Sequence, residues 1–415
     1  MEKCFRLAFC LFQTIIDPNK DSKGRLVKGI SDYRRKLIFT KKTMRFLSLY
    51  MLLALFLSAC QPPTTHEEEV QTRGIWLTNV ASEAMFSREG IREAVATCKK
   101  YGFNTIFVVT WNRGYTLYPS AVMEREFGLK IDPAMAGRDP LQEVIEEAHA
   151  QGIRVFAWFE FGFSSSYQEE DGGHLLRKHP EWAAIGPDGK LVSKNGFQWM
   201  NAFDPKVQDF ILSLLVEVVD KYQVDGIQGD DRLPALPSLA GYDPLTVSLY
   251  QKSHDGALPP SDYLDTAWVD WRAQRLNAFM QRLYDTVKAA NPHAIISVSP
   301  SIYPWSKEQY LQDWPTWVRQ GWVDMVCPQV YRYDIDKYRA ELAKIVNEQM
   351  PRGKLDILAP GILLKVDDYV APDSLLEQMV AENRKYGIEG EVFFYYEGVK
   401  LRPKFFESWA ALPKE

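Results

Sequence analysis

From Thr72 onward the chain alternates short apolar runs with amphipathic segments. Apolar residues recur at helical spacing in these segments, as Ile91, Val95 and Cys98 do after the candidate N-cap Ser87. The predicted helices are 87–101, 140–150, 205–222, 268–290, 306–320, 335–348 and 373–386. The apolar runs predict eight buried strands at 74–80, 104–111, 153–161, 224–229, 294–301, 323–331, 355–363 and 391–398.

This order predicts an α/β protein with a (β/α)8 TIM barrel, because strands buried on both faces are continuous apolar runs. An open doubly wound sheet is the alternative, although no glycine-rich phosphate-binding turn follows the first strand. One insertion is expected after strand three, at 162–204, where turn signals such as Asn195-Gly196 gather. We expect this insertion to cover the mouth of the barrel.

The N-terminal region has the order of a signal peptide. Basic residues precede an apolar run at 46–59, and small residues close it. The sequence Leu57-Ser58-Ala59-Cys60 resembles the bacterial lipobox, in which the cysteine is lipidated and becomes the new N-terminus. A plain secretory signal and an uncleaved anchor after a cytoplasmic extension are the alternatives.

These features divide the chain into three parts. Residues 1–59 are expected to be a doubtful extension plus the lipoprotein signal peptide, with Met44 as the expected start. Residues 60–71 are a polar, proline-bearing tether, and residues 72–415 form the TIM-barrel domain.

The amino-acid composition and charge limit the kinds of molecule that we expect the protein to bind. The 415 residues are 46% hydrophobic and 25% charged, as in a globular protein, and the net charge is −5. Residues 1–59 are basic, with 12 Lys and Arg against 4 Asp and Glu, so the remainder is strongly acidic. An acidic body argues against nucleic acid as a partner. The five cysteines show no metal or disulfide spacing, so we expect neither a metal nor a cofactor.

Chemistry in a TIM barrel lies at the carboxyl ends of the strands. The polar and aromatic residues at these ends are mainly carboxylates, amides and aromatics, and no base stands beside a Ser or Cys nucleophile. The candidates are Asn79, Trp111, Asn112, Arg113, Tyr118, Glu160, Asp230, Asp231, Arg232, Tyr303, Gln329, Tyr331, Tyr396 and Glu397.

Paired carboxylates with aromatic neighbours are typical of glycosidases, in which one acid protonates the leaving oxygen and a second acts as base, nucleophile or stabiliser. Asp230 and Asp231 are the first candidates, and Glu160 is the next. Neighbours on a strand point to opposite faces, so only one of the two aspartates faces the barrel axis while the strand lasts. At the strand end this rule loosens, and both side chains are then able to reach the mouth. The structural alternatives are an ion pair with Arg232, a helix N-cap, and, for Glu160, a salt bridge inside the mouth.

Several aromatic residues are candidates for stacking on sugar rings. Trp111, Tyr303 and Tyr331 follow polar strand ends, and Trp305 lies close by. A buried core position is the alternative for each of them. Of the other candidates, Arg113 and Gln329 are expected to orient hydroxyl or acetamido groups, or to pack behind the site. The predicted substrate-binding set comprises Asn79, Trp111, Asn112, Arg113, Tyr118, Arg232, Tyr303, Gln329, Tyr331, Tyr396 and Glu397.

Taken together, several motifs resemble the bacterial glycosyl hydrolase-like 10 family. They are RGIWLTNV, NTIFVVTWNRGYTLYPS, DPLQEVIEEAHAQGIRVFAWFE, VDGIQGDD, and ISVSPS with DMVCPQVY. The resemblance covers roughly 73–400. It implies a TIM barrel in a family whose members include lipoproteins that cut peptidoglycan glycan strands lacking stem peptides.

Two motifs depart from the family's usual pattern. Gln228-Gly229 stand where the family more often has His-Phe, and Glu160-Phe161 stand where it often has Asn-Pro. Both tandem aspartates are kept, at Asp230 and Asp231, so the resemblance implies that the chain can hydrolyse a glycan.

The expected protein is a lipid-anchored glycoside hydrolase of the cell envelope, held by Cys60 at the outer membrane of a Gram-negative bacterium. Asp230 or Asp231 is the general acid, with the other aspartate or Glu160 as second carboxylate. The partners are a polysaccharide, glycan strands first, and a membrane through the anchor alone. The alternatives are hydrolysis of a dietary or host polysaccharide, and a carbohydrate-binding lipoprotein without catalysis.

Overall fold

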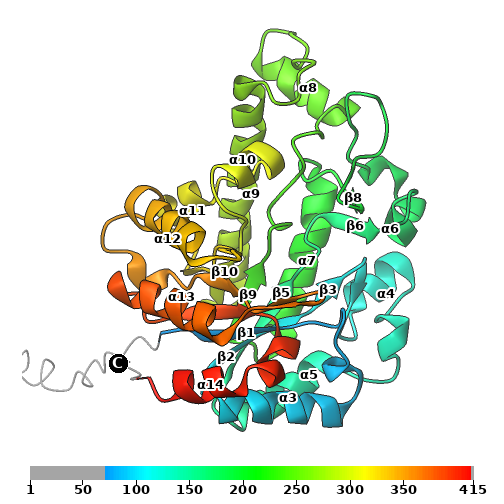
Figure 1. Ribbon diagram of the computed structural model, residues 1–415. Helices are drawn as coiled ribbons and strands as arrows, with labels where there is room; N and C mark the ends of the chain where they lie inside the picture. The colour runs from blue at the N-terminus through cyan, green and yellow to red at the C-terminus, as the bar shows by residue number, and fades with distance from the viewer. Residues whose placement is uncertain (1–70, 413–415) are drawn as a thin grey trace, which may run out of the picture. The chain divides into compact units, whose positions relative to one another are not determined.

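Eight parallel strands form the centre of the computed structural model, which describes residues 71–412 (Figure 1). The predicted signal segment, Cys60 and nearly all of the tether lie outside these residues. The strands are β1 (Arg73–Leu77), β2 (Thr105–Val109), β5 (Arg154–Phe159), β9 (Gly226–Gly229), β10 (Ile295–Val298), β11 (Met325–Val326), β12 (Gly361–Leu363) and β15 (Glu391–Phe394).

The strands pair in the order β11-β10-β9-β5-β2-β1-β15-β12. Two isolated parallel bridges, Val326 to Leu358 and Gln329 to Gly361, link the two outer strands. The pairing therefore runs around the whole ring, and the predicted (β/α)8 barrel is confirmed. Each strand lies within its predicted range, except that β1 begins one residue earlier, at Arg73. The regular part of β12 begins only at Gly361, because Pro360 has no N–H to give to the ladder.

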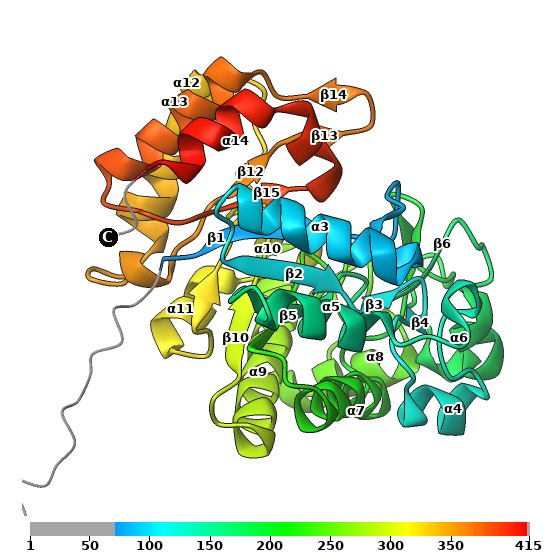
Figure 2. The same ribbon diagram turned by 90° about the horizontal axis from the view of Figure 1, so that it is seen from below.

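Helices lie around the outside of the strands (Figure 2). An Asp-Pro pair begins three of them: the aspartate at the N-cap accepts a backbone N–H and the proline fits the first turn. The predicted cap Ser87 accepts from the N–H of Gly90. The main helices are α3 (Arg88–Lys100), α5 (Pro140–His149), α7 (Pro205–Lys221), α8 (Pro244–Ser253), α9 (Thr266–Ala290), α12 (Ile335–Lys344), α13 (Asp373–Lys385) and α14 (Pro403–Ala410).

Two predicted helices differ in detail. The segment 306–320 contains two short helices, α10 (Trp305–Tyr310) and α11 (Trp314–Gln320), separated at Leu311, which has a left-handed backbone. The helix predicted at 335–348 changes to a π-type turn after Lys344. Among the helices of residues 71–412, none has the length and apolar character needed to cross a membrane.

The predicted insertion after strand three folds as a small antiparallel sheet. Its strands β6 (Ser164–Tyr167), β7 (Ser193–Lys194) and β8 (Phe197–Trp199) pair in the order β6-β8-β7, and α6 (Gly173–Lys178) packs beside them. Asn195 and Gly196 both have positive φ values, 55° and 81°, so the turn signal placed the β7–β8 hairpin correctly.

A second insertion was not predicted. Residues 230–265 separate β9 from α9 and contain α8, which stands away from the strands in Figure 1. The prediction of a single insertion was therefore wrong. The signal was present in Asp243-Pro244, a helix start far ahead of the helix predicted at 268–290.

Inside the barrel, aromatic rings pack together and a chain of hydrogen bonds joins one of them to polar side chains. Trp76 packs against Trp158 at 6.4 Å between ring centroids, and its Nε1 donates to Oε1 of Gln228 at 2.7 Å. Gln228 donates in turn to Oγ of Ser297 at 3.0 Å. These inward side chains fix the direction in which the residues two positions later point.

Candidate active site

The alternation of side chains along each strand decides which candidates face the axis. Trp158, Gln228 and Ser297 point into the barrel, so Glu160, Asp230 and Ser299 point the same way one layer higher. Asp231 lies beyond the end of β9, and its side chain is 28% exposed, against 5% for Asp230. Of the two aspartates, Asp230 is therefore the more enclosed.

Arg232 contacts all three candidate acids. Its Nη2 lies 3.3 Å from Oδ2 of Asp230 and 3.5 Å from Oε1 of Glu160. Its Nη1 lies 2.9 Å from Oδ1 of Asp231, and its Nε donates to the backbone carbonyl of Glu160 at 2.9 Å. The ring of Phe197, from strand β8 of the insertion, lies 4.6 Å from the guanidinium carbon. Arg232 is therefore the cation that the three acids share.

Asp230 is the most enclosed of the three acids. Burial raises the pKa of its carboxyl well above the ordinary value, the charge of Asp231 adds to the rise, and Arg232 opposes it. Gln329 donates from Nε2 to Oδ1 of Asp230 at 2.8 Å. Gln312 donates from Nε2 to the backbone carbonyl of Asp230 at 3.0 Å. Side chains from the segment after β11 and from the turn between α10 and α11 thus hold this aspartate in place.

Glu160 faces Asp230 across Arg232. Burial raises the pKa of Glu160, and the charge of Arg232 opposes that rise. Asn112 donates from Nδ2 to Oε2 of Glu160 at 2.5 Å. Because one Arg232 nitrogen contacts both carboxylates, their nearest oxygens are at most about 7 Å apart, which is in the range of glycosidase acid pairs.

Tyr310 and Tyr331 lie beside the acids. Burial and the charge of Asp231 raise the pKa of Tyr310 to about 12, and its hydroxyl accepts from Nδ2 of Asn195 at 3.0 Å. Burial and the charges of Asp230 and Asp231 raise the pKa of Tyr331 well above its ordinary value. Gln312 and Tyr310 were not among the predicted site residues, because Tyr310 ends α10 and Gln312 lies between α10 and α11, where no strand-end signal is present.

One predicted stacking residue, Trp111, lies in the core. Trp111 is fully buried, its Nε1 donates to the carbonyl of Gly162 at 3.0 Å, and its ring packs against Phe210. The regular strand ends at Val109 and a separate strand, β3 (Trp111–Asn112), begins after Thr110, so the alternation is broken. As a result Asn112, and not Trp111, reaches the acids.

Tyr118 is also buried, and its hydroxyl donates to Oε2 of Glu217 on α7, in the helical layer. Tyr396 is 2% exposed and lies near Lys400, in the 3-10 helix η6 (Tyr396–Leu401). Tyr118 is enclosed on all sides, whereas Tyr396 lines the pocket of Asn79 and Glu397 described below, apart from the acids. Both contacts belong to packing between helices or turns outside the barrel.

Asn79 and Glu397 line a separate pocket of about 670 Å³. None of the three acids lines it. Glu397 accepts from Oγ of Ser82 at 2.7 Å. This pocket lies between the ends of β1 and β15, so the two residues share the strand-end side of the barrel with the acids without contacting them.

The remaining candidates occupy the edge of the site. Arg113 is exposed, with a positive φ of 51°, and its charge lowers the pKa of Glu160. Tyr303 is half-buried, and its carbonyl accepts from Nε2 of Gln349 at 3.1 Å. Within residues 71–412 no group of three or more His, Cys, Asp and Glu side chains is arranged to hold a metal ion.

A (β/α)8 barrel that brings three carboxylates together at its strand ends has the architecture of the glycoside hydrolases. The chain belongs to the glycosyl hydrolase-like 10 family, which it matches over residues 71–354. It is 26% identical to the glycosyl hydrolase DigH of Escherichia coli (strain K12) over 381 residues, covering 73% of this chain and 81% of DigH. It is 24% identical to the glycosyl hydrolase YngK of Bacillus subtilis (strain 168), covering 70% of this chain and 60% of YngK.

Solved structures of glycoside hydrolases share the fold. The glycoside hydrolase domain of PgaB (BpsB) from Bordetella bronchiseptica superposes with a TM-score of 0.63 at 12% identity, covering 82% of this chain and 98% of that domain. The alpha-L-fucosidase isoenzyme 2 of Paenibacillus thiaminolyticus superposes with a TM-score of 0.59 at 16% identity, covering 82% of this chain and 48% of the fucosidase. At such identities the likeness concerns the fold.

Proposed function

We propose that the chain is a glycoside hydrolase of the cell envelope that cleaves an amino-sugar polymer. Glycan strands of peptidoglycan are the first candidate substrate. The observation that carries the proposal is the convergence of Asp230, Glu160 and Asp231 on Arg232 at the carboxyl ends of the strands. A barrel that only binds carbohydrate needs aromatic surfaces but no converging acids, so this geometry favours hydrolysis.

Asp230 is proposed as the general acid. Three carboxylates face one guanidinium, and burial disfavours an excess of negative charge, so the group favours holding a proton. Asp230 has the least exposed side chain of the three and the carboxyl whose pKa is raised well above normal. Such an acid stays protonated at pH values where an ordinary aspartate is ionised, and it can give its proton to the glycosidic oxygen.

Glu160 is proposed as the second carboxylate. It faces the same mouth, and the charge of Arg232 and the Asn112 hydrogen bond both favour its ionised form. An anion there stabilises the positive charge that develops at the anomeric carbon, or activates the attacking water. Asp231 is proposed to keep Arg232 in position through their 2.9 Å contact.

The proposed location depends on the lipobox. Lipidation of Cys60 and removal of the preceding segment would hold the barrel at a membrane that faces the cell wall. The polar tether at 60–71 would let the mouth reach glycan strands. This part of the proposal is supported by the sequence pattern alone.

The test is a hydrolysis assay with the full chain. We expect purified protein to release fragments, identified by mass spectrometry, from peptidoglycan glycan strands freed of stem peptides. Dietary and host polysaccharides, assayed in parallel, test the alternative substrates. Asp230→Asn should lower the rate by about 10²- to 10⁴-fold, because it removes the transferable proton and preserves shape.

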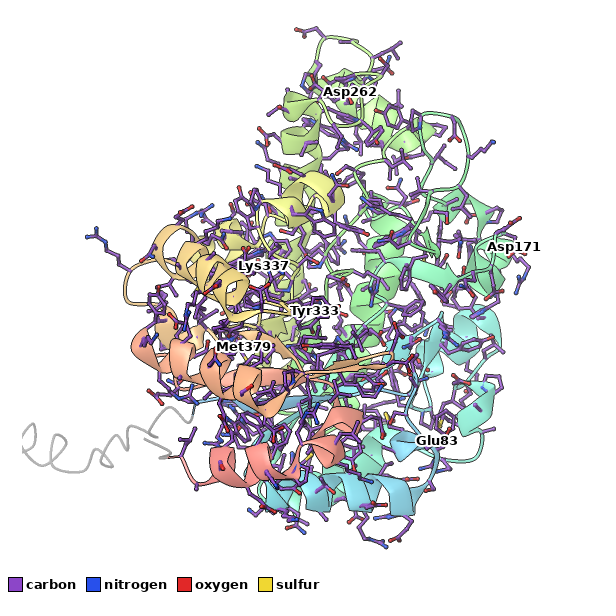
Figure 3. All side chains as sticks on the ribbon, in the orientation of Figure 1. Glu83, Asp171, Asp262, Tyr333, Lys337 and Met379 are labelled. Carbon is purple, nitrogen blue, oxygen red and sulfur yellow. The ribbon has the colours of Figure 1, made fainter. Side chains whose placement is uncertain are left out.

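Asp171→Asn is the matched control, since Asp171 is an exposed aspartate of the insertion, ion-paired with Arg177 (Figure 3). It should leave the rate unchanged. Release of no fragments from any glycan by the folded wild-type protein would contradict the proposed activity. If the protein cleaved only another polysaccharide, the proposed chemistry would stand and the proposed substrate would be wrong.

A further inference from the structure

Two exposed aromatic side chains lie in the segments that follow two neighbouring barrel strands. Trp305 is 42% exposed and Tyr333 is 62% exposed, in a domain whose other large aromatic side chains are mostly buried. Exposing a large aromatic ring to water has a free-energy cost, so such a ring at a strand end is a typical contact for the apolar face of a ligand. Trp305 follows β10 and Tyr333 follows β11.

The segment that carries Trp305 also contacts Asp230. The ring of Trp305 packs 5.4 Å from that of Tyr310, whose pKa is raised in part by the charge of Asp231. Two residues beyond Tyr310, Gln312 donates to the backbone carbonyl of Asp230. The segment 305–312 therefore carries an exposed ring at one end and a contact to the acid at the other.

The segment that carries Tyr333 contacts Asp230 as well. The ring of Tyr333 packs edge-on against that of Tyr369, with centroids 4.7 Å apart and an angle of 76°. Tyr369 begins β14 (Tyr369–Val370), which pairs with β13 (Lys365–Val366) as a hairpin after β12. Four residues before Tyr333, Gln329 donates to Oδ1 of Asp230.

Two segments thus hold Asp230 by one glutamine each, and each segment ends in an exposed aromatic ring. We propose that Trp305 and the Tyr333–Tyr369 pair are two sugar-stacking platforms on either side of Asp230. The occupant is an internal stretch of a glycan chain, with its rings on both platforms and the scissile bond at the acid. The inference rests on the proposed function and names the form of its substrate: a chain longer than a disaccharide.

Binding to a length series tests this inference without turnover. Full-length protein carrying Asp230→Asn is titrated calorimetrically with peptidoglycan glycan strands and with chito-oligosaccharides, each from disaccharide to octasaccharide. We expect affinity to rise with chain length. Trp305→Ala and Tyr333→Ala, each added to this protein, should weaken binding of the longest chains by about five- to tenfold and leave disaccharide binding unchanged.

Trp305→Phe and Tyr333→Phe keep a ring and should restore most of the affinity. Tyr263→Ala is the matched control, because Tyr263 is 36% exposed and its neighbour Asp262 lies far from Tyr333 in Figure 3. Three results would overturn the inference. They are an affinity that does not depend on chain length, platform variants that bind as tightly as the parent Asp230→Asn protein, and no binding to either series. Platform-dependent binding combined with no cleavage by the wild-type protein would contradict the hydrolase proposal and leave the platforms established.

Discussion

Gln329 donates a hydrogen bond to Asp230 across 99 positions of sequence, from the segment after β11 to the end of β9. The amide N–H favours the ionised carboxylate, so it limits the rise in the pKa of Asp230 that burial causes. The same amide nitrogen also lies 3.1 Å from the carbonyl of Ser299. One side chain therefore both orients the proposed acid and adjusts its affinity for a proton.

Replacing Gln329 by leucine should move the alkaline limb of the profile of rate against pH. Loss of the donor raises the pKa of Asp230, so the limb should move to higher pH, by about 0.5–1 unit for a hydrogen bond of ordinary strength. The measurement is kcat/KM against pH on the glycan that the wild-type protein cleaves. Gln142→Leu, on the exposed surface of α5, is the control. A limb that stays in place would show that Gln329 does not influence the acid.

Asp230→Asn should stabilise the protein while it lowers the rate. The pKa of Asp230 is raised in the folded state, so its contribution to stability is greatest below the unfolded pKa and is lost as pH rises through the folded pKa. Asparagine does not ionise, so the variant does not lose this stability as the pH rises. We expect a Tm higher than wild type by about 2–4 °C at pH 8, with the difference shrinking toward pH 4. A lower Tm at pH 8 would contradict a buried acid at this position.

Asp231→Asn should reduce the rate less than Asp230→Asn does. Asp231 is more exposed than Asp230 and contacts Arg232, so its replacement frees the guanidinium without removing the proposed proton donor. The two variants, each checked for folding by circular dichroism, are compared by kcat on the same substrate. Near-normal rates in both would leave Glu160 and Glu397 as the remaining acids to test.

Arg232→Met should make stability strongly dependent on pH. Without the guanidinium, three clustered carboxylates have no counter-ion, and breaking such a buried pair costs about 3–5 kcal/mol. The carboxyl pKa values rise, so the loss of stability should appear as pH increases. Thermal unfolding from pH 4 to pH 8 measures it. Arg125→Met, in an exposed ion pair with Glu126, should follow the wild-type curve.

Trp111→Ala should destabilise the fold and leave glycan affinity unchanged in the molecules that remain folded. The residue is fully buried, so the cavity is expected to cost about 3–5 kcal/mol in the free energy of unfolding. Denaturant unfolding and calorimetric binding separate the two effects. Weakened binding with normal stability would place Trp111 in contact with the substrate.

Cys60→Ala should abolish membrane association. The lipobox predicts a thioether-linked lipid at Cys60, and no other residue of the pattern supplies the thiol. Metabolic labelling with a radioactive fatty acid, followed by fractionation, measures both the lipid and the location. Ser58→Ala keeps a small residue before the cysteine and is the control. Unchanged labelling of Cys60→Ala would remove the lipobox interpretation.

The sequence predicted the barrel well because buried parallel strands are continuous apolar runs. It also predicted Asp230 and Glu160, since polar residues at the end of an apolar strand are unusual and conspicuous. The position of Trp111 was not predictable in this way. It depends on the break at Thr110, which reverses the faces, and no local pattern marks that break.

Gln312 was missed for a different reason. Its contact with Asp230 joins residues 82 positions apart and depends on how α10 and α11 turn at Leu311. Such a contact is a property of tertiary packing. Arg232 was predicted to bind substrate, with an ion pair to an aspartate as the alternative, whereas the structure brings Glu160 into contact with it as well.

The two bridges that close the ring between β11 and β12 form a seam, because every other neighbouring pair of strands shares a regular ladder. One of the bridges is made by Gln329. If the ring opens locally at this seam, the contact between Gln329 and Asp230 is lost together with the bridge. The boundary of the barrel with the fewest ladder hydrogen bonds therefore also holds the residue that orients the proposed proton donor, so local order at the seam and the position of the acid depend on the same side chain.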